Sequence, residues 1–390
     1  MDPVVPRYGL GSLADVVPSL LAGLDVPGMD NVLGLTTTSR ICILLVDGLG
    51  WHLLREHGSY ATFLTSLTAK RDPITAGFPS TTVTSIAALA AGMPAGEHGL
   101  VGYSFAAGPD EGQLLDALLW QRHGVAERVD LRPVLVPEDI QPRRTAFEHA
   151  ADAGVAVRLV VPGEQEGSGL SRAVLRGGQF RGVRALGDLV SRTLEALHER
   201  DRLICYTYHA DLDTIGHIYG PGSDPWRRQL TFVDQLAAAI AENLPQGGTL
   251  LVTADHGMVT TDAPNRIDFD TDTTLQDGVL MLGGEARVRH VYTVAGAEDD
   301  VRARWTDVLK DRAWILSRDE AIAAGWFGPR VAEHVRPRIG NLIVAASAPI
   351  AIVRSKVEPL QSQLVGHHGS LTADEQLVPL LMTANASEPT

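Results

Sequence analysis

Three short, mostly apolar runs that each lead into acidic or imidazole side chains constrain the fold of this chain most strongly. They are residues 41–46 (ICILLV), 203–208 (LICYTY) and 249–253 (TLLVT). Such runs are typical of strands buried on both faces of a parallel sheet. Helical patterns and one further strand-like run alternate with them, at residues 144–153, 186–199, 226–242 and 155–161. We therefore predict an α/β fold with a doubly wound, mostly parallel sheet covered by helices on both faces.

The stretch from residue 279 to residue 353 has a different pattern. It mixes apolar runs such as VLMLGG and NLIVAASAPIAIV with two amphipathic stretches. This mixture predicts a smaller α+β lobe inserted into the larger domain. The larger α/β domain would then comprise residues 1–278 and 354–390, and it would contain all the strand ends named above.

The overall charge limits the kinds of partner that this chain can bind. The 390 residues carry a formal net charge of −14, and 45% of them are hydrophobic. An acidic protein repels polyphosphate backbones, so we expect no binding to nucleic-acid polymers. A small phosphorylated substrate remains compatible with this charge, because a bound metal ion reverses the local field.

The amino terminus has an acidic residue and early prolines where a signal peptide would have a basic and then an apolar region. No apolar run reaches the roughly twenty residues of a membrane helix. These features predict a cytoplasmic protein without membrane association. The sequence does not indicate an oligomeric state.

Acidic and imidazole side chains gather where the predicted strands end, and a further pair of histidines lies in a glycine-rich segment downstream. A single aspartate after a strand is commonly a turn residue or a helix cap. Several at one edge of a sheet indicate a metal site, since carboxylate and imidazole groups suit zinc, manganese or iron. The candidate ligands are Asp47, Asp213, His217, Asp255, His256, His367 and His368.

A small-residue helix is predicted after Phe78-Pro79, in the segment FPSTTVTSIAALAAG that ends at Gly92. Ser80, Thr81 or Thr82 would stand at its start. One interpretation is an ordinary helix cap. The other is a nucleophilic hydroxyl at a helix amino terminus, where backbone N–H groups and the helix dipole favour anions.

The order of these motifs resembles that of a known family. VDGLG, FPSTT, GMPAGEHGL, DTIGH followed by GP, TADHGM and GHHGS occur in sequence between about residues 41 and 381. This set is similar to the alkaline phosphatase superfamily and, more narrowly, to the type I phosphodiesterase/nucleotide pyrophosphatase family. The resemblance implies the fold predicted above and two divalent metal ions, zinc first, with manganese or iron as alternatives.

The resemblance also implies roles for individual residues. One ion would be held by Asp213, His217 and His368. The other would be held by Asp47, Asp255 and His256 together with a hydroxyl nucleophile. Related sequences place that nucleophile ten positions before the helix-ending glycine, which gives Thr82 here, with Thr81 as its neighbour and competitor. The family's phosphate-contacting asparagine has no counterpart, and Tyr103 stands near its place as a candidate substrate contact. His98, His209, Asp211 and His367 are interpreted as structural or neighbouring residues.

The predicted function is metal-dependent hydrolysis of phosphate diesters or nucleotide pyrophosphates by double displacement, through a phospho-threonine intermediate. A phosphomonoesterase or a phosphonate hydrolase of the same superfamily is the alternative. A non-catalytic metal-binding module that retains the fold is a more distant one.

Overall fold

A six-stranded sheet forms the centre of the computed structural model, which describes residues 2–36, 38–107, 112–125 and 127–385. Its strand order is β19-β9-β1-β8-β6-β7, and every neighbouring pair is parallel except β19 with β9. The predicted α/β fold with a mostly parallel sheet is confirmed. The strands are β1 (Arg40–Val46), β6 (Ala156–Pro162), β7 (Gln179–Val183), β8 (Leu203–His209), β9 (Gly248–Thr253) and β19 (Leu380–Ala384).

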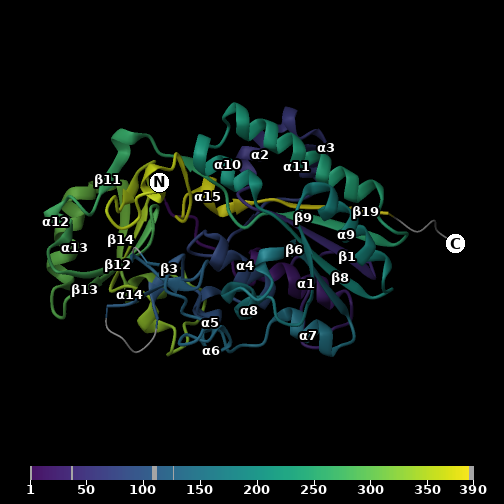
Figure 1. Cartoon of the computed structure of the whole chain (residues 1–390), viewed down its shortest axis with the longest axis horizontal. Coiled ribbons are helices and arrows are strands. Elements are labelled where there is room, and N and C mark those ends of the chain that lie inside the picture. Colours follow the sequence, from purple (N-terminus) through teal and green to yellow (C-terminus); the bar gives the residue numbers. More distant parts are fainter. Residues whose placement is uncertain (1, 37, 108–111, 126, 386–390) are drawn as a thin grey trace.

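Helices cover both faces of this sheet, as Figure 1 shows for α3 and α11 above it and α1 and α7 below it. Local sequence sets where they begin. Ser223 accepts a hydrogen bond from the backbone of Trp226 and caps α11, while the Thr145–Glu148 capping box starts α7. The helices on the two faces are α3 (Thr62–Leu67), α9 (Leu186–His198) and α11 (Asp224–Glu242), opposite α1 (Val16–Ala22), α4 (Thr82–Ala91) and α7 (Ala146–Asp152).

The remaining elements are short and mostly connect or edge the main layers. The helices are α2 (Trp51–Glu56), α5 (Ala95–His98), α6 (Pro137–Ile140), α8 (Gly169–Val174), α10 (Asp211–Tyr219), α12 (Thr273–Gln276), α14 (Arg318–Ala323) and α15 (Ala373–Gln376). The strands are β2 (Ile74–Thr75), β10 (Val259–Thr260), β11 (Arg266–Asp268), β16 (Ala351–Val353), β17 (Gly366–His367) and β18 (Leu377–Val378). Among the residues described, no helix is long and apolar enough to cross a membrane.

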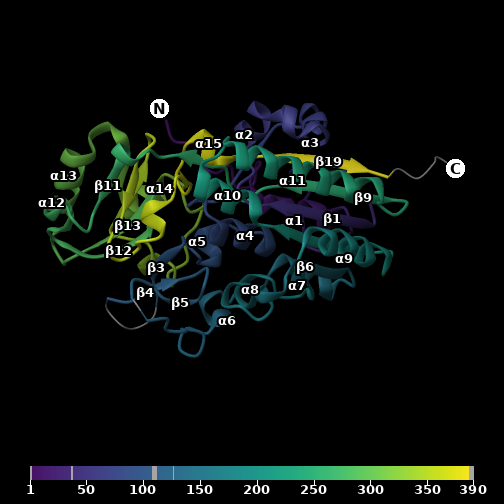
Figure 2. The same ribbon diagram turned by 45° about the horizontal axis from the view of Figure 1, so that its top comes forward.

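A second, antiparallel sheet lies beside the first, at the left of Figures 1 and 2. Its order is β12-β13-β15-β14, and helix α13 (Glu298–Leu309) packs with it around a separate apolar cluster that includes Trp305 and Leu342. The strands are β12 (Val279–Glu285), β13 (Val288–Thr293), β14 (Ala313–Ser317) and β15 (Leu342–Ala346). Phe269 and Leu275 also belong to this cluster, and the expected lobe bounds of 279 and 353 stay a prediction.

A small three-stranded sheet packs against the second sheet, and the sequence patterns did not predict it. It consists of β3 (Ser104–Ala106), β4 (Leu114–Asp116) and β5 (Gln121–Arg122). The Ser104 hydroxyl donates a hydrogen bond to the carbonyl oxygen of Gly284 at 2.9 Å, which ties β3 to β12.

A buried ion pair joins the second sheet to the carboxyl-terminal part of the chain. Arg287, in the turn between β12 and β13, donates two hydrogen bonds to the carboxylate of Glu375, at 3.0 and 2.7 Å. Both side chains are fully buried. The same carboxylate accepts from the backbone N–H of Ser370 and from the Thr372 hydroxyl. The pair therefore holds the loop that follows residue 367 against the tip of the β12–β13 hairpin.

We expect removal of one member of this pair to destabilise the fold strongly. Glu375→Ala leaves a buried guanidinium unpaired, and the expected loss is about 3–5 kcal/mol in the free energy of unfolding. The double variant Arg287→Met/Glu375→Leu should recover most of that loss. Arg302→Ala, which breaks the half-exposed pair with Glu320, is the control and should cost about 1 kcal/mol or less. Urea unfolding of the four proteins measures these differences. Equal losses from the buried and the exposed pair would contradict the role assigned to Glu375.

Candidate active site

The carboxyl ends of three adjacent strands bring the predicted acidic residues together. Asp47 follows β1 directly, Asp255 lies just beyond β9, and Asp213 lies on α10, which follows β8. Because β1 lies between β9 and β8, the three side chains meet at one edge of the sheet. Gly48 allows this approach: its φ is +75°, and a Cβ there would lie 3.0 Å from the Cα of Asp213.

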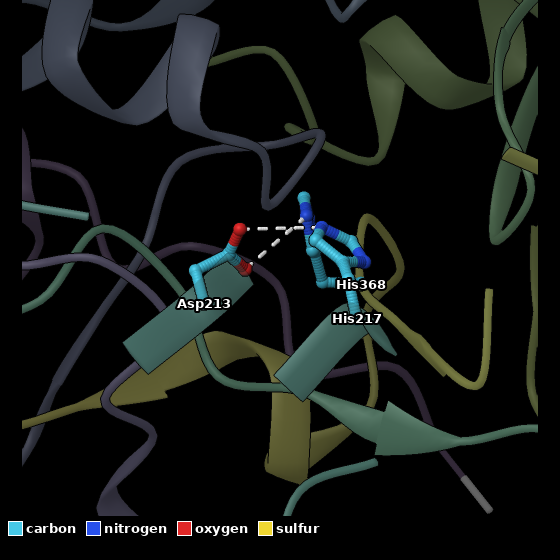
Figure 3. Close-up of side chains that lie close together, drawn as sticks. All are labelled: Asp213, His217 and His368. Carbon is cyan, nitrogen blue, oxygen red and sulfur yellow. Dashed lines mark ion pairs between the residues drawn. The ribbon is translucent and has the colours of Figure 1, made fainter. Parts of the chain in front are cut away.

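One group of candidate ligands consists of Asp213, His217 and His368. His217 Nε2 lies 3.2 Å from Asp213 Oδ2, and His368 Nε2 lies 3.9 Å from Asp213 Oδ1. Figure 3 shows the carboxylate facing both imidazoles. Asp213 and His217 are one turn apart on α10, whereas His368 comes from the loop after β17.

The second group consists of Asp47, Asp255 and His256, all buried. His256 Nε2 lies 3.4 Å from an oxygen of each aspartate and 3.3 Å from the hydroxyl oxygen of Thr82. The two groups adjoin each other, because the rings of His256 and His368 stack with their centroids 3.6 Å apart. The structure thus brings all six predicted ligands and Thr82 into one site.

Backbone carbonyl groups orient the three imidazoles in the same way. The Nδ1 atoms of His217, His256 and His368 lie 2.8, 3.0 and 3.0 Å from the carbonyl oxygens of Gly366, Gly257 and Ser80, respectively. A carbonyl only accepts, so each Nδ1 carries a proton in these bonds, and each Nε2 is the ring nitrogen that faces the carboxylates and that could bind a cation once it is unprotonated. Histidines that bind metal ions are commonly held by such a bond from the other ring nitrogen.

The three aspartates each keep one oxygen without a hydrogen-bond partner among the described residues. These oxygens are Asp47 Oδ1, Asp213 Oδ1 and Asp255 Oδ2, and all three are buried. Backbone N–H groups of Gly48 and His256 donate to the other oxygen of Asp255, and Tyr208 donates to the other oxygen of Asp47. Buried unpaired carboxylate oxygens are costly unless they bind a cation. The donor set of carboxylate oxygens and imidazole nitrogens therefore fits two divalent cations.

Burial and neighbouring charges shift the pKa values of Asp47, Asp213 and His217. Burial raises the pKa of Asp47, and the neighbouring charges of Asp255 and Asp213 raise it further. Burial lowers the pKa of His217, but Asp213 beside it outweighs burial and raises that pKa to about 9. Burial also raises the pKa of Asp213, yet His217 and His368 outweigh it and hold that pKa below its usual range. Asp213 and His217 therefore form a pair of opposite charges at neutral pH.

Thr82 and Thr81 occupy different positions at the start of α4. Thr82 is the first residue of the helix and faces His256, whereas Thr81 is the residue before it, in extended conformation. Helix α4 ends at Gly92, whose φ of +68° gives the left-handed conformation expected of a helix-ending glycine. The first turn of α4 adjoins the metal-ligand groups, which places helical N–H groups beside the Thr82 hydroxyl.

A cavity of about 280 Å³ opens beside the two groups of ligands. Tyr103 lines it, with its hydroxyl donating to Asp116 at 3.0 Å. Among the residues that the structure describes, no lysine or arginine lines this cavity. The lining residues are Thr81, Thr82, Val83, Tyr103, Leu118, Asp213, His217, Glu285, Ala286, Glu358, Gln361, Leu364, His367 and His368.

The histidines interpreted as structural lie outside both ligand groups, and so does Asp211. His98 is buried and accepts a hydrogen bond from the backbone N–H of Leu100 at its Nδ1. His367 Nε2 lies 3.1 Å from the carbonyl oxygen of Leu364, while His209 contacts Gln229. Sequence reasoning missed the cavity residues Glu285, Leu118 and Gln361, which lie in segments without any catalytic motif.

Solved structures of an ectonucleotide pyrophosphatase/phosphodiesterase and of a phosphonoacetate hydrolase share the fold of this chain. Human ectonucleotide pyrophosphatase/phosphodiesterase 5 superposes with a TM-score of 0.65 at 17% identity, covering 89% of this chain and 88% of that one. Phosphonoacetate hydrolase from Sinorhizobium meliloti, in complex with phosphonoacetate, gives 0.64 at 17% identity, covering 90% and 91%.

The chain belongs to the type I phosphodiesterase/nucleotide pyrophosphatase family, whose model matches residues 41–371. The resemblance predicted from the motifs is therefore confirmed, and the chain is a hydrolase of this type. A partial relative is the GPI ethanolamine phosphate transferase 1 of Aspergillus oryzae, 33% identical over 119 residues. That match covers 29% of this chain and only 11% of the relative's length.

We expect divalent cations to stabilise the protein through these ligands. Zinc at about 100 times its dissociation constant should raise the free energy of unfolding by about 2.7 kcal/mol, because only the folded chain assembles the site. Asp213→Asn should reduce that increase. Asp211→Asn is the matched control, since it changes an aspartate of the same helix outside both groups. Scanning calorimetry with and without zinc after chelation measures the effect. An equal zinc response in both variants would contradict the ligand assignment.

Proposed function

We propose that this chain hydrolyses phosphate diesters or nucleotide pyrophosphates by double displacement, with Thr82 as the nucleophile. Asp213, His217 and His368 would hold one divalent cation, and Asp47, Asp255 and His256 the other, with zinc first and manganese or iron as alternatives. The observation that carries the proposal is the common orientation of six donor groups. Three imidazole Nε2 atoms and three carboxylate oxygens without a hydrogen-bond partner among the described residues converge beside one hydroxyl.

In the proposed reaction, the Thr82 oxygen attacks phosphorus in line with the leaving oxygen. The Thr82 hydroxyl loses its proton as its oxygen bonds to phosphorus, the bond from phosphorus to the leaving oxygen breaks, and the leaving group takes up a proton. Water then attacks the phospho-threonine, and the bond from phosphorus to the Thr82 oxygen breaks to restore the hydroxyl. Cations bound at the two groups would lower the pKa of the hydroxyl and offset the charge of the transferred phosphoryl group.

The charge of the cavity favours diesters over monoesters. A phosphate diester carries one negative charge near neutral pH, whereas a monoester carries up to two. Enzymes that hold the second charge commonly use arginine or lysine, and no such side chain lines the cavity among the described residues. A volume of about 280 Å³ suits a small phosphorylated molecule.

Two related structures are consistent with a small phosphorylated or phosphonylated ligand. Murine ectonucleotide pyrophosphatase/phosphodiesterase 5 was solved as an inactive variant in complex with AMP, and it superposes with a TM-score of 0.64 at 16% identity. The phosphonate in the Sinorhizobium meliloti enzyme makes phosphonate hydrolysis the second candidate. Phosphomonoester hydrolysis is the third.

Turnover of three chromogenic substrates separates these candidates. Bis(p-nitrophenyl) phosphate, p-nitrophenyl phosphate and p-nitrophenyl phenylphosphonate are each offered to chelated protein and to protein resupplied with zinc or manganese. We expect the diester to have the highest kcat/KM, and its turnover to depend on the added metal. A higher kcat/KM for the monoester or the phosphonate would instead identify the protein as a phosphomonoesterase or a phosphonate hydrolase. Metal-loaded protein inert to all three would contradict the proposed hydrolysis.

Substitutions of the two neighbouring threonines test the nucleophile. Thr82→Ala should lower kcat for the diester by at least about 10³-fold, because the covalent step is lost while metal binding is kept. Thr82→Ser should restore part of the activity. Thr81→Ala is the matched control and should lower kcat by less than about tenfold, since Thr81 lines the cavity but Thr82 is the residue whose hydroxyl contacts His256. Steady-state kinetics with metal content measured in parallel checks this. Full activity of Thr82→Ala would overturn the assignment.

A further inference from the structure

A tyrosine beside the buried group of candidate ligands, Asp47, Asp255 and His256, holds one of the carboxylate oxygens of that group. Tyr208 lies on β8, and its hydroxyl donates a hydrogen bond to Asp47 Oδ2. In the parallel register, Tyr208 stands beside Leu45, two residues before Asp47. Both partners of the hydrogen bond are buried. The contact leaves Oδ1 as the oxygen of Asp47 that has no hydrogen-bond partner among the described residues.

The backbone holds the other aspartate of the buried group in the same way. Asp255 Oδ1 accepts hydrogen bonds from the N–H groups of Gly48 and His256, while Oδ2 has no partner in the described part of the chain. The two oxygens without a partner, Asp47 Oδ1 and Asp255 Oδ2, each lie 3.4 Å from His256 Nε2. Each aspartate of the buried group therefore presents one oxygen atom, and Tyr208 is the side chain that sets this for Asp47.

The group of Asp213, His217 and His368 has no such restraint. Among the described residues, neither oxygen of Asp213 accepts a hydrogen bond from a backbone N–H or a hydroxyl group. Oδ2 lies 3.2 Å from His217 Nε2, and Oδ1 lies 3.9 Å from His368 Nε2. These three residues also line the cavity, whereas the ligands of the buried group do not. Water from the cavity can therefore add donors at the first group, but the chain itself sets the number of donors at the buried group.

The buried group thus offers four donor atoms to a cation. They are one oxygen from each aspartate, His256 Nε2 and the hydroxyl oxygen of Thr82, which lies 3.3 Å from that nitrogen. Zinc is commonly four-coordinate in proteins and accepts this mixture of oxygen and nitrogen donors. Manganese favours six donors, mostly oxygen. An Asp47 carboxylate that is free to bind through both oxygens would supply a fifth donor, so the Tyr208 hydroxyl influences which cation the group prefers.

We propose that Tyr208 is a positioning residue that limits Asp47 to binding through one oxygen, so that the buried group prefers a four-coordinate cation, zinc over manganese. The inference rests on the proposed function, which assigns a divalent cation to this group, and it adds how the chain selects that cation. Tyr208 is not among the described residues that line the cavity, so it acts through Asp47.

Removal of a single hydroxyl group tests the inference, and the same strand supplies a matched control. Tyr208→Phe frees Asp47 Oδ2. Tyr206→Phe removes the hydroxyl of a buried tyrosine two residues earlier on β8, which has no hydrogen-bond partner among the described residues. Both variants are made in His217→Ala protein, in which the other group has lost a ligand, so that one cation per chain is measured at the buried group.

Two measurements report on the number of donors around that cation. We expect Tyr208→Phe to lower the ratio of the dissociation constants for manganese and zinc by about tenfold, while Tyr206→Phe keeps the ratio. Cobalt bound in place of zinc absorbs visible light strongly when it is four-coordinate and weakly when it is six-coordinate, so Tyr208→Phe should weaken this absorption and Tyr206→Phe should not. Metal content and circular dichroism measured in parallel show that each protein is loaded and folded.

The outcomes separate this inference from the proposed function. If Tyr208→Phe and Tyr206→Phe give the same cobalt absorption and the same manganese-to-zinc ratio, the inference is overturned and the proposed function stands. Equal loss of both cations from Tyr208→Phe also overturns it, because Tyr208 would then only support the fold. If Tyr208→Phe does not fold, X-ray absorption of zinc bound to the His217→Ala protein decides: four donors support the inference, and five or six overturn it. Protein that binds no cation at the buried group contradicts the metal assignment of the proposed function and the inference with it.

Discussion

Three buried carboxylates, Asp47, Asp213 and Asp255, meet at the ends of adjacent parallel strands, and the arrangement of the surrounding site depends on their mutual repulsion. Each keeps one oxygen without a hydrogen-bond partner among the described residues, while backbone N–H groups or a tyrosine hydroxyl contact the other oxygens of Asp255 and Asp47. Cations between the carboxylates would offset this repulsion. The imidazole Nε2 atoms face the same space, so the carboxylates and histidines together form the donor set to which the proposed cations would bind.

The second sheet completes this site from outside the main sheet. The Arg287–Glu375 pair joins the β12–β13 hairpin to the segment that carries His368, and the Glu375 carboxylate also binds the backbone of Ser370. One buried contact therefore positions a candidate metal ligand and the cavity residue Glu285 at the same time. Because the positions of His368 and Glu285 both depend on the Arg287–Glu375 contact, the stability of the second sheet and the geometry of the site are coupled.

Much of the fold and most of the site could be predicted from the sequence, because their determinants are local. The apolar runs of β1, β8 and β9 and the acidic residues after them are contiguous in the chain, and parallel strands bring their carboxyl ends to one edge. The motif alone does not separate Thr82 from Thr81, since a one-residue slip leaves it intact. The helix start distinguishes the two residues: Thr82 faces His256 and Thr81 precedes the helix.

The remaining features could not be predicted, because they depend on contacts between distant segments. Glu285 lies in the run GGEARV, which reads as an ordinary hairpin end, and its place in the lining of the active-site cavity is visible only in the folded chain. The small sheet β3–β5 and the antiparallel edge strand β19 are too short for a clear periodicity. The stacking of His256 on His368 joins residues more than a hundred positions apart.

The most direct test of the account is the anomalous diffraction of crystals grown from zinc-loaded protein, collected at the zinc absorption edge. The account predicts two peaks in the site, one within coordination distance of Asp213, His217 and His368, and one within coordination distance of Asp47, Asp255 and His256. Peaks located elsewhere, or no peak between the carboxylates at saturating zinc, would contradict it.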